Sequence, residues 1–161
     1  MKKILSLITV LFVSNLVFAQ SAKFIDETLK AETVTIGQMC YMAALTQELI
    51  PVTASETEAY NALFENAETV SSKIEKPANY ATACSILAKA WNVKGGLFFT
   101  LSKKSPRYAF KQFKSDGIIH SNIDPNTFPT GQQVLTMYTN CEERYGTKTD
   151  NQSDQSQGEN E

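Results

Sequence analysis

The chain has 161 residues, of which 42% are hydrophobic and 20% are charged, and its formal net charge is −2 at pH 7. This length is enough for one globular domain with a single core, and too short for several. The excess of acidic over basic residues argues against nucleic acid as a partner.

Residues 1–19 have the pattern of a secretory signal peptide. Lys2 and Lys3 precede an apolar run over residues 4–18, and Val17 and Ala19 are small or apolar where a signal peptidase reads the chain. The run is about 15 residues long, shorter than the roughly 20 that cross a bilayer. We predict cleavage after Ala19, a periplasmic or cell-envelope location and no transmembrane segment thereafter; the alternative is an uncleaved membrane anchor.

The last residues, 146–161, contain no large apolar side chain and are built of Thr, Asp, Asn, Gln, Ser, Gly, Lys and Glu. Such a segment cannot bury enough surface to offset its conformational entropy. We therefore predict a disordered acidic tail and one folded domain over residues 20–145. Without Lys2 and Lys3, the exported chain has 13 basic and 17 acidic residues, a net charge of about −4.

Helix starts are the clearest local signals in the predicted domain. Capping boxes, in which a Ser or Thr and the Glu or Gln three residues later satisfy each other's backbone amides, mark three of them: Thr35 with Gln38, Ser55 with Glu58, and Thr130 with Gln133. Asn79 opens a further helix, and Ser105 followed by Pro106 opens another. With apolar residues recurring every three or four positions after each start, we predict an all-α domain of about five helices.

Two segments of this pattern need interpretation. An apolar stripe of Tyr60, Leu63, Phe64, Ala67, Val70 and Ile74 predicts one continuous helix over residues 55–74. We expect Gly95 and Gly96 to stop the helix that opens at Asn79. The short apolar run 97–101 that follows them has no visible strand partner. We predict that residues 95–104 form a packed loop.

The helix starts at Thr35 and Thr130 share a threonine cap, a Gln at the third position and an apolar continuation. The similarity has two explanations that remain open. One is a decayed internal repeat. The other is chance, because capping boxes are common.

Residues 105–138 carry four short motifs in a fixed order: Tyr108-Ala109, Gly117-Ile118-Ile119, an Asp-containing turn from Asp124 to Phe128, and Thr130-Gly131-Gln132-Gln133. Their order resembles the second half of an S-layer homology module, and the similarity extends over about 79–142 if Tyr80 to Trp91 is the preceding helix. The resemblance implies a helical fold and attachment to an anionic cell-wall polymer. One departure concerns binding: Gly131 and Gln133 stand where that family has the Arg and Glu of Thr-Arg-Ala-Glu.

Charge is segregated along the chain. Seven basic residues and no acidic residue occur over residues 89–115: Lys89, Lys94, Lys103, Lys104, Arg107, Lys111 and Lys114. Over residues 48–75 the balance is reversed, with six glutamates against Lys73. The folded domain should therefore have an acidic and a basic side that can guide oppositely charged partners.

We predict that the basic side binds carboxylates or phosphates, with Arg107 making bidentate contacts. The predicted binding residues combine the cations of the helix that opens at Ser105, and of the loop before it, with two aromatic rings that could stack on a sugar: Arg107, Lys111, Lys114, Lys103, Lys104, Tyr108 and Trp91. For Trp91 this requires an exposed ring near the end of its helix. The alternative is an ordinary solvated face whose charges pair with the acidic helix.

Catalytic signatures are absent from the sequence. His120 is the single histidine, and no nucleophile elbow, zinc-protease motif or phosphate-binding loop occurs. The spacing of Cys40, Cys84 and Cys141 does not suit a metal; they are either small buried hydrophobic residues or include one disulfide. We expect no cofactor, no metal and no enzymatic activity.

These observations predict an exported, non-enzymatic cell-envelope protein that binds an anionic cell-wall polymer or an acidic partner through a basic helix face. The alternative is a structural or assembly component that docks on another envelope protein through an apolar and basic surface.

Overall fold

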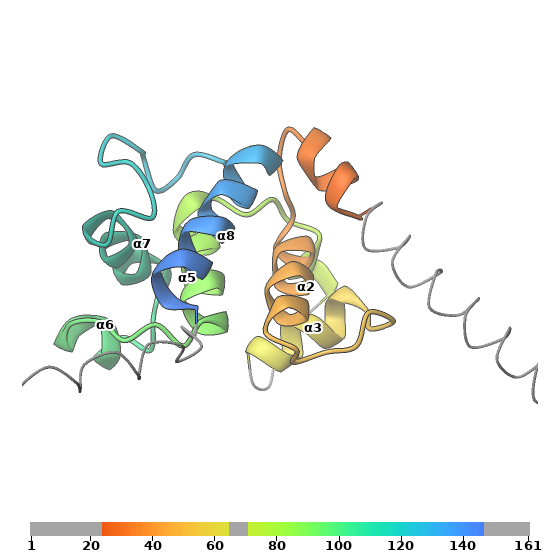
Figure 1. Ribbon diagram of the computed structural model, residues 1–161, viewed down its shortest axis with the longest axis horizontal. Helices are drawn as coiled ribbons and strands as arrows, with labels where there is room; N and C mark the ends of the chain where they lie inside the picture. The colour runs from red at the N-terminus through yellow and green to blue at the C-terminus, as the bar shows by residue number, and fades with distance from the viewer. Residues whose placement is uncertain (1–23, 65–70, 147–161) are drawn as a thin grey trace, which may run out of the picture.

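A computed structural model of the chain describes residues 24–64 and 71–146 (Figure 1). Their secondary structure is helical, which confirms the prediction of an all-α fold. A helix over residues 24–30 precedes the labelled elements: α2 (Ile36–Thr46), α3 (Glu56–Leu63), α4 (Ser71–Ile74), α5 (Tyr80–Ala90), α6 (Leu97–Leu101), α7 (Pro106–Ser115) and α8 (Gly131–Tyr145). The predicted signal peptide, and the predicted tail beyond Gly146, lie outside the described residues. Within the described ranges, no helix combines the length and hydropathy needed to cross a membrane.

All three predicted capping boxes are confirmed. At the start of α2, the Gln38 backbone amide donates to Thr35 Oγ1 at 3.1 Å and the Thr35 amide donates to Gln38 Oε1 at 3.0 Å. The starts of α3 and α8 repeat this reciprocal pattern. Ser105 differs, because its side chain makes no capping bond and only Pro106 favours that start.

The helix predicted over residues 55–74 is wrong as a single element. α3 ends at Leu63, Phe64 has an extended backbone with φ −127° and ψ 93°, and α4 begins at Ser71. The Phe64 ring stacks on Tyr60, with 4.8 Å between centroids, and the Lys89 ammonium of α5 lies 4.3 Å from its centroid. The Lys89 contact joins the end of α3 to α5 and depends on tertiary structure, which periodicity cannot register. Two members of the predicted stripe, Ala67 and Val70, lie outside the described residues.

The prediction of a packed loop over residues 95–104 also needs correction, because the segment contains the short helix α6. Leu97 and Leu101 are 79% and 76% exposed, whereas Phe99 is buried. The two leucines are four residues apart and so share one face of the helix, away from Phe99. The preceding helix α5 ends at Ala90, before the glycine pair; Trp91 is its C-cap and Asn92 follows with φ 44°.

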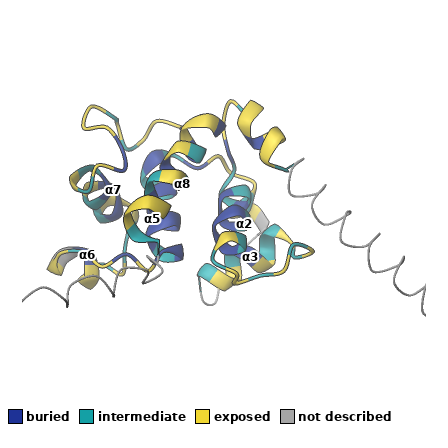
Figure 2. Cartoon of the chain, in the orientation of Figure 1, coloured by how far each residue is buried: buried dark blue, intermediate teal, exposed yellow. Residues whose placement is uncertain are grey.

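Helices α2, α5 and α8 form the centre of the fold. α3 and α4 pack on α2, α7 packs on α5, and α5 also contacts α2 and α8. In Figure 1, α2 and α3 lie on one side of the molecule, α6 and α7 on the other, and α5 and α8 between them. The buried surfaces of these helices face inward (Figure 2). The Tyr138 hydroxyl donates to the Met42 carbonyl and so joins α8 to α2 directly.

The N-terminal helix 24–30 is joined to α8 at Gly131. The Gly131 amide donates to the Ala31 carbonyl at 2.9 Å. A Cβ atom at position 131 would lie 1.6 Å from the Thr28 carbonyl oxygen, far inside van der Waals contact. No side chain fits here unless the backbone moves, which gives a physical reason for glycine at this position.

Cys40, Cys84 and Cys141 are free and completely buried. They therefore act as small hydrophobic core residues, the first of the two interpretations above, and not as a disulfide. Burial raises the pKa of the Cys40 and Cys141 thiols to about 12, and it also raises the pKa of Cys84. Thiols in this state are poor nucleophiles.

Candidate functional site

The residues predicted to bind a ligand separate into three groups in the folded chain. The first is Trp91 alone, which is only 7% exposed. Its Nε1 donates to Glu142 Oε2 at 3.0 Å, and its ring meets Tyr138 edge-on at 4.7 Å. The prediction of an exposed, sugar-stacking Trp91 is therefore wrong. A signal was present in the sequence, since Trp91 continues the apolar stripe of α5 one turn after Leu87.

The second group is the α7 basic face, which consists of Arg107, Lys111 and Lys114. Arg107 and Lys111 are exposed, and Lys111 Nζ lies 5.8 Å from the centroid of the half-buried Tyr108 ring. Lys114 is half-buried, 4.8 Å from the Phe110 centroid, and donates to the Ser121 carbonyl at 2.7 Å. Within the described residues, no ion pair joins this face to the acidic helix α3.

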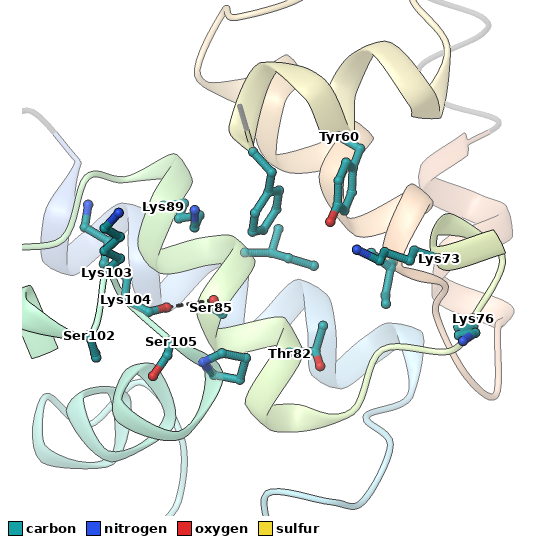
Figure 3. Close-up of a pocket in the computed structure, with 14 residues that line it drawn as sticks. Tyr60, Lys73, Lys76, Thr82, Ser85, Lys89, Ser102, Lys103, Lys104 and Ser105 are labelled. Atoms are coloured by element: carbon teal, nitrogen blue, oxygen red, sulfur yellow. Dashed lines mark hydrogen bonds between the residues drawn. The ribbon is translucent and has the colours of Figure 1, made fainter. Parts of the chain in front are cut away.

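The third group, Lys103 and Lys104, belongs to a hollow of about 370 Å³ that lies between α2, α3, α4, α5 and the segment before α7 (Figure 3). We call this hollow the lysine pocket. It is lined by five lysines, five apolar or aromatic residues and four hydroxyl residues: Lys73, Lys76, Lys89, Lys103, Lys104; Ile36, Tyr60, Phe64, Ile86, Pro106; Thr82, Ser85, Ser102, Ser105. No Asp or Glu occurs among these described lining residues.

The lysines come from separate elements. Lys73 belongs to α4, Lys76 follows it, and Lys89 lies in the last turn of α5. Figure 3 shows Lys89, Lys103 and Lys104 on one side of the lysine pocket, and Lys73, Lys76 and Tyr60 on the other. Like charges gathered around one hollow raise the local positive potential and favour an anion there.

Lys103 and Lys104 are held in an uncommon backbone conformation. Their φ angles are 52° and 58°, in the left-handed region that side chains other than Gly, Asn and Asp rarely adopt. Each such residue costs on the order of 1–3 kcal/mol and persists only where the surroundings impose it. Here the buried Ser85 hydroxyl donates to the Lys104 carbonyl at 2.8 Å, and the Lys104 amide donates to the Phe99 carbonyl at 3.1 Å.

The Lys104 ammonium is also positioned. Its Nζ donates to Asn92 Oδ1 at 2.7 Å. Burial, and secondarily the charge of Lys89, lower the pKa of Lys104. A bound anion would counter both effects, because it favours the charged ammonium and screens the repulsion between the two lysines.

Sequence reasoning found only part of the lysine pocket. Lys103 and Lys104 were among the predicted binding residues, and Lys89 was counted in the basic run. Lys73 lies within the acidic stretch 48–75 and Lys76 directly after it, and neither carried a signal for a site. They join the others only because α4 packs against α2 and α3.

His120 and Cys141 are described side chains of the types that take part in nucleophilic catalysis. His120 is exposed, and Cys141 is buried with a raised pKa, which excludes it as a ready nucleophile. Within the described part of the chain, no group of three or more His, Cys, Asp or Glu side chains could hold a metal ion.

Comparison with protein-family models, with curated proteins and with solved structures finds no match to this chain. The resemblance to an S-layer homology module therefore stays a prediction.

Proposed function

We propose that this chain is an exported, non-enzymatic envelope protein that binds an anionic cell-wall polymer, with the lysine pocket as the centre of contact. The observation that carries the proposal is the convergence of five lysines on one hollow whose described lining has no acidic side chain. The α7 basic face begins at Arg107, directly after Pro106 in the lining of the lysine pocket. Arg107 is the cation best suited to bidentate contact with carboxylate or phosphate.

The residues that bind the polymer in this proposal differ from the ones that the family resemblance would imply. At position 131, where the S-layer homology pattern has an arginine, the Thr28 carbonyl leaves no room for a side chain. Any polymer contact must then use other cations, and Lys73, Lys89 and Lys104 are among the five lysines grouped around one hollow.

Cosedimentation with purified peptidoglycan that retains its anionic polymer tests this function. Binding should weaken as salt is added, because salt screens exposed charges. The double variant Lys73→Glu with Lys104→Glu should bind at least about tenfold more weakly, equivalent to about 1.4 kcal/mol. A matched control, Lys30→Glu with Lys94→Glu, makes the same change in net charge outside the lysine pocket and should retain binding.

Two outcomes would count against the proposal. Absence of cosedimentation at low salt would remove polymer binding altogether. Equal losses in the pocket variant and in the matched control would show that only net charge matters. Arg107→Glu with Lys111→Glu measures the contribution of the α7 basic face, which we expect to be the smaller one.

A second candidate function has one specific observation in its favour. Leu97 and Leu101 are exposed on the same face of α6, and the exposed Lys103 follows them. An apolar and basic surface of this kind would suit docking on an acidic patch of another envelope protein. Crosslinking in whole envelopes tests it: a specific adduct should disappear in Leu97→Gln with Leu101→Gln and persist in Lys73→Glu with Lys104→Glu.

A further inference from the structure

The lysine pocket has an apolar interior as well as charged lysines. Ile86 is completely buried beneath it, and Ile36, Phe64 and Tyr60 form further walls. A purely polar anion would use the lysines and leave these walls in contact with water. An occupant with an apolar part would also cover the walls, which is favourable because apolar surface is then removed from water.

The aromatic wall is already ordered. The Tyr60 and Phe64 rings stack with 19° between their planes, and the Lys89 ammonium sits over the Phe64 ring. In Figure 3, Tyr60 and Lys89 face the hollow from opposite sides. The cation and the apolar surface therefore lie within a few ångströms of each other, and one small ligand can touch both.

Size narrows the ligand further. The volume of about 370 Å³ lies at the lower end of the range for small-molecule sites, roughly 300–1,000 Å³. Such sites combine mostly apolar walls with a few placed polar groups. The placed groups here are the Lys104 ammonium, which Asn92 holds, and the Lys89 ammonium, which lies over Phe64.

We propose that the lysine pocket binds a small amphipathic acid: one carboxylate or similar anionic group between Lys89 and Lys104, on a short alkyl body that lies against Phe64, Tyr60 and Ile36. The inference rests on the proposed function, since it uses the same anion site. It goes further by naming the ligand class as a medium-chain alkyl acid.

Isothermal titration calorimetry on the full exported chain tests this with three probes: decanoate below its micelle concentration, acetate, and decanol. Decanoate should bind at least about tenfold more tightly than either of the others, because only decanoate satisfies both the charge and the apolar walls. Its binding should also show a negative heat-capacity change, the marker of apolar burial. These comparisons use the unaltered protein and do not depend on any variant folding.

Variants then locate the site. Lys89→Gln with Lys104→Gln should weaken decanoate binding about tenfold or more, whereas the matched control Lys30→Gln with Lys94→Gln should not change it. Ile36→Ser should weaken decanoate and leave acetate unaffected. Circular dichroism confirms that each variant is folded.

The outcomes separate this inference from the proposed function. Equal affinity for decanoate and acetate, with polymer binding intact, would overturn the inference and leave the proposed function standing. Equal affinity for decanoate and decanol would overturn the inference, because the carboxylate would then contribute nothing to binding. Failure to bind polymer, decanoate and acetate alike would overturn both.

Discussion

Gly131→Ala should destabilise the fold, because the added Cβ displaces the N-terminal helix 24–30 from α8. The added Cβ would lie 1.6 Å from the Thr28 carbonyl oxygen and 2.7 Å from its carbon. These are backbone atoms, so no side-chain rotation can relieve the contact. The segment at Thr28 must move by about 2 Å to restore normal packing distances, and the movement strains the bond from the Gly131 amide to the Ala31 carbonyl.

The expected cost follows from these terms. Overpacking of this kind typically costs about 1–3 kcal/mol, and a lost backbone hydrogen bond about 0.5–1.5 kcal/mol. Replacing glycine by alanine returns about 0.4–1 kcal/mol through the lower entropy of the unfolded chain. We expect a net loss of about 2 kcal/mol, and a fall in Tm of roughly 5–15 °C for a domain of this size.

Two other glycines provide graded controls. A Cβ at Gly96 would meet nothing within 4 Å, so Gly96→Ala should be neutral or slightly stabilising. A Cβ at Gly37 would lie 2.0 Å from Glu56 Oε2, the end of a side chain that can rotate away, although Ile74 Cβ is also close at 3.0 Å. Thermal and urea unfolding should rank the losses as Gly131, then Gly37, then Gly96. A Gly131→Ala protein as stable as Gly96→Ala would refute the reasoning.

Three further predictions follow from buried groups. A thiol reagent should titrate Cys40, Cys84 and Cys141 in the denatured, unreduced protein but react slowly with the native protein near about pH 8, because burial keeps the thiols protonated; fewer than three thiols after denaturation would point to a disulfide. Trp91 fluorescence should be blue-shifted and poorly quenched by iodide, because the ring is buried. Strong quenching would show instead that the ring is exposed to solvent. Burial raises the pKa of Glu56, so its charged form opposes folding. Glu56→Gln should therefore stabilise the protein at neutral pH in urea unfolding, and the advantage should vanish below about pH 4, where Glu56 is itself protonated. A gain that persists in acid would contradict this cause.

Local chemistry was readable from the sequence because its partners lie three or four residues apart. The capping boxes at Thr35, Ser55 and Thr130 all formed as predicted. Gly117 follows the C-cap of α7, and its φ of 77° is the conformation that favours glycine. The apolar residues that recur after the start at Asn79, Leu87 among them, lie in the core as part of α5. The all-α class follows from these signals alone.

Contacts between distant segments decided where helices end and which side chains are buried or exposed. Phe64, at the end of α3, lies under the Lys89 ammonium of α5, and no periodic pattern contains that contact. Trp91 is buried because α8 supplies Glu142 as a hydrogen-bond partner 51 residues away. Leu97 is exposed because it lies on the face of the short helix α6 that points away from the buried Phe99.

The candidate site shows the same division. The sequence by itself determined that positive charge gathers over residues 89–115 and that position 131 lacks the arginine of the resembled family. Only the tertiary structure decided that Lys73 joins Lys104 around one apolar hollow, and that the Thr28 carbonyl occupies the space a side chain at 131 would need. The physical reason is range: hydrogen bonds and periodicity within one helix are set by neighbouring residues, whereas a pocket is enclosed by helices that meet only when the whole chain packs.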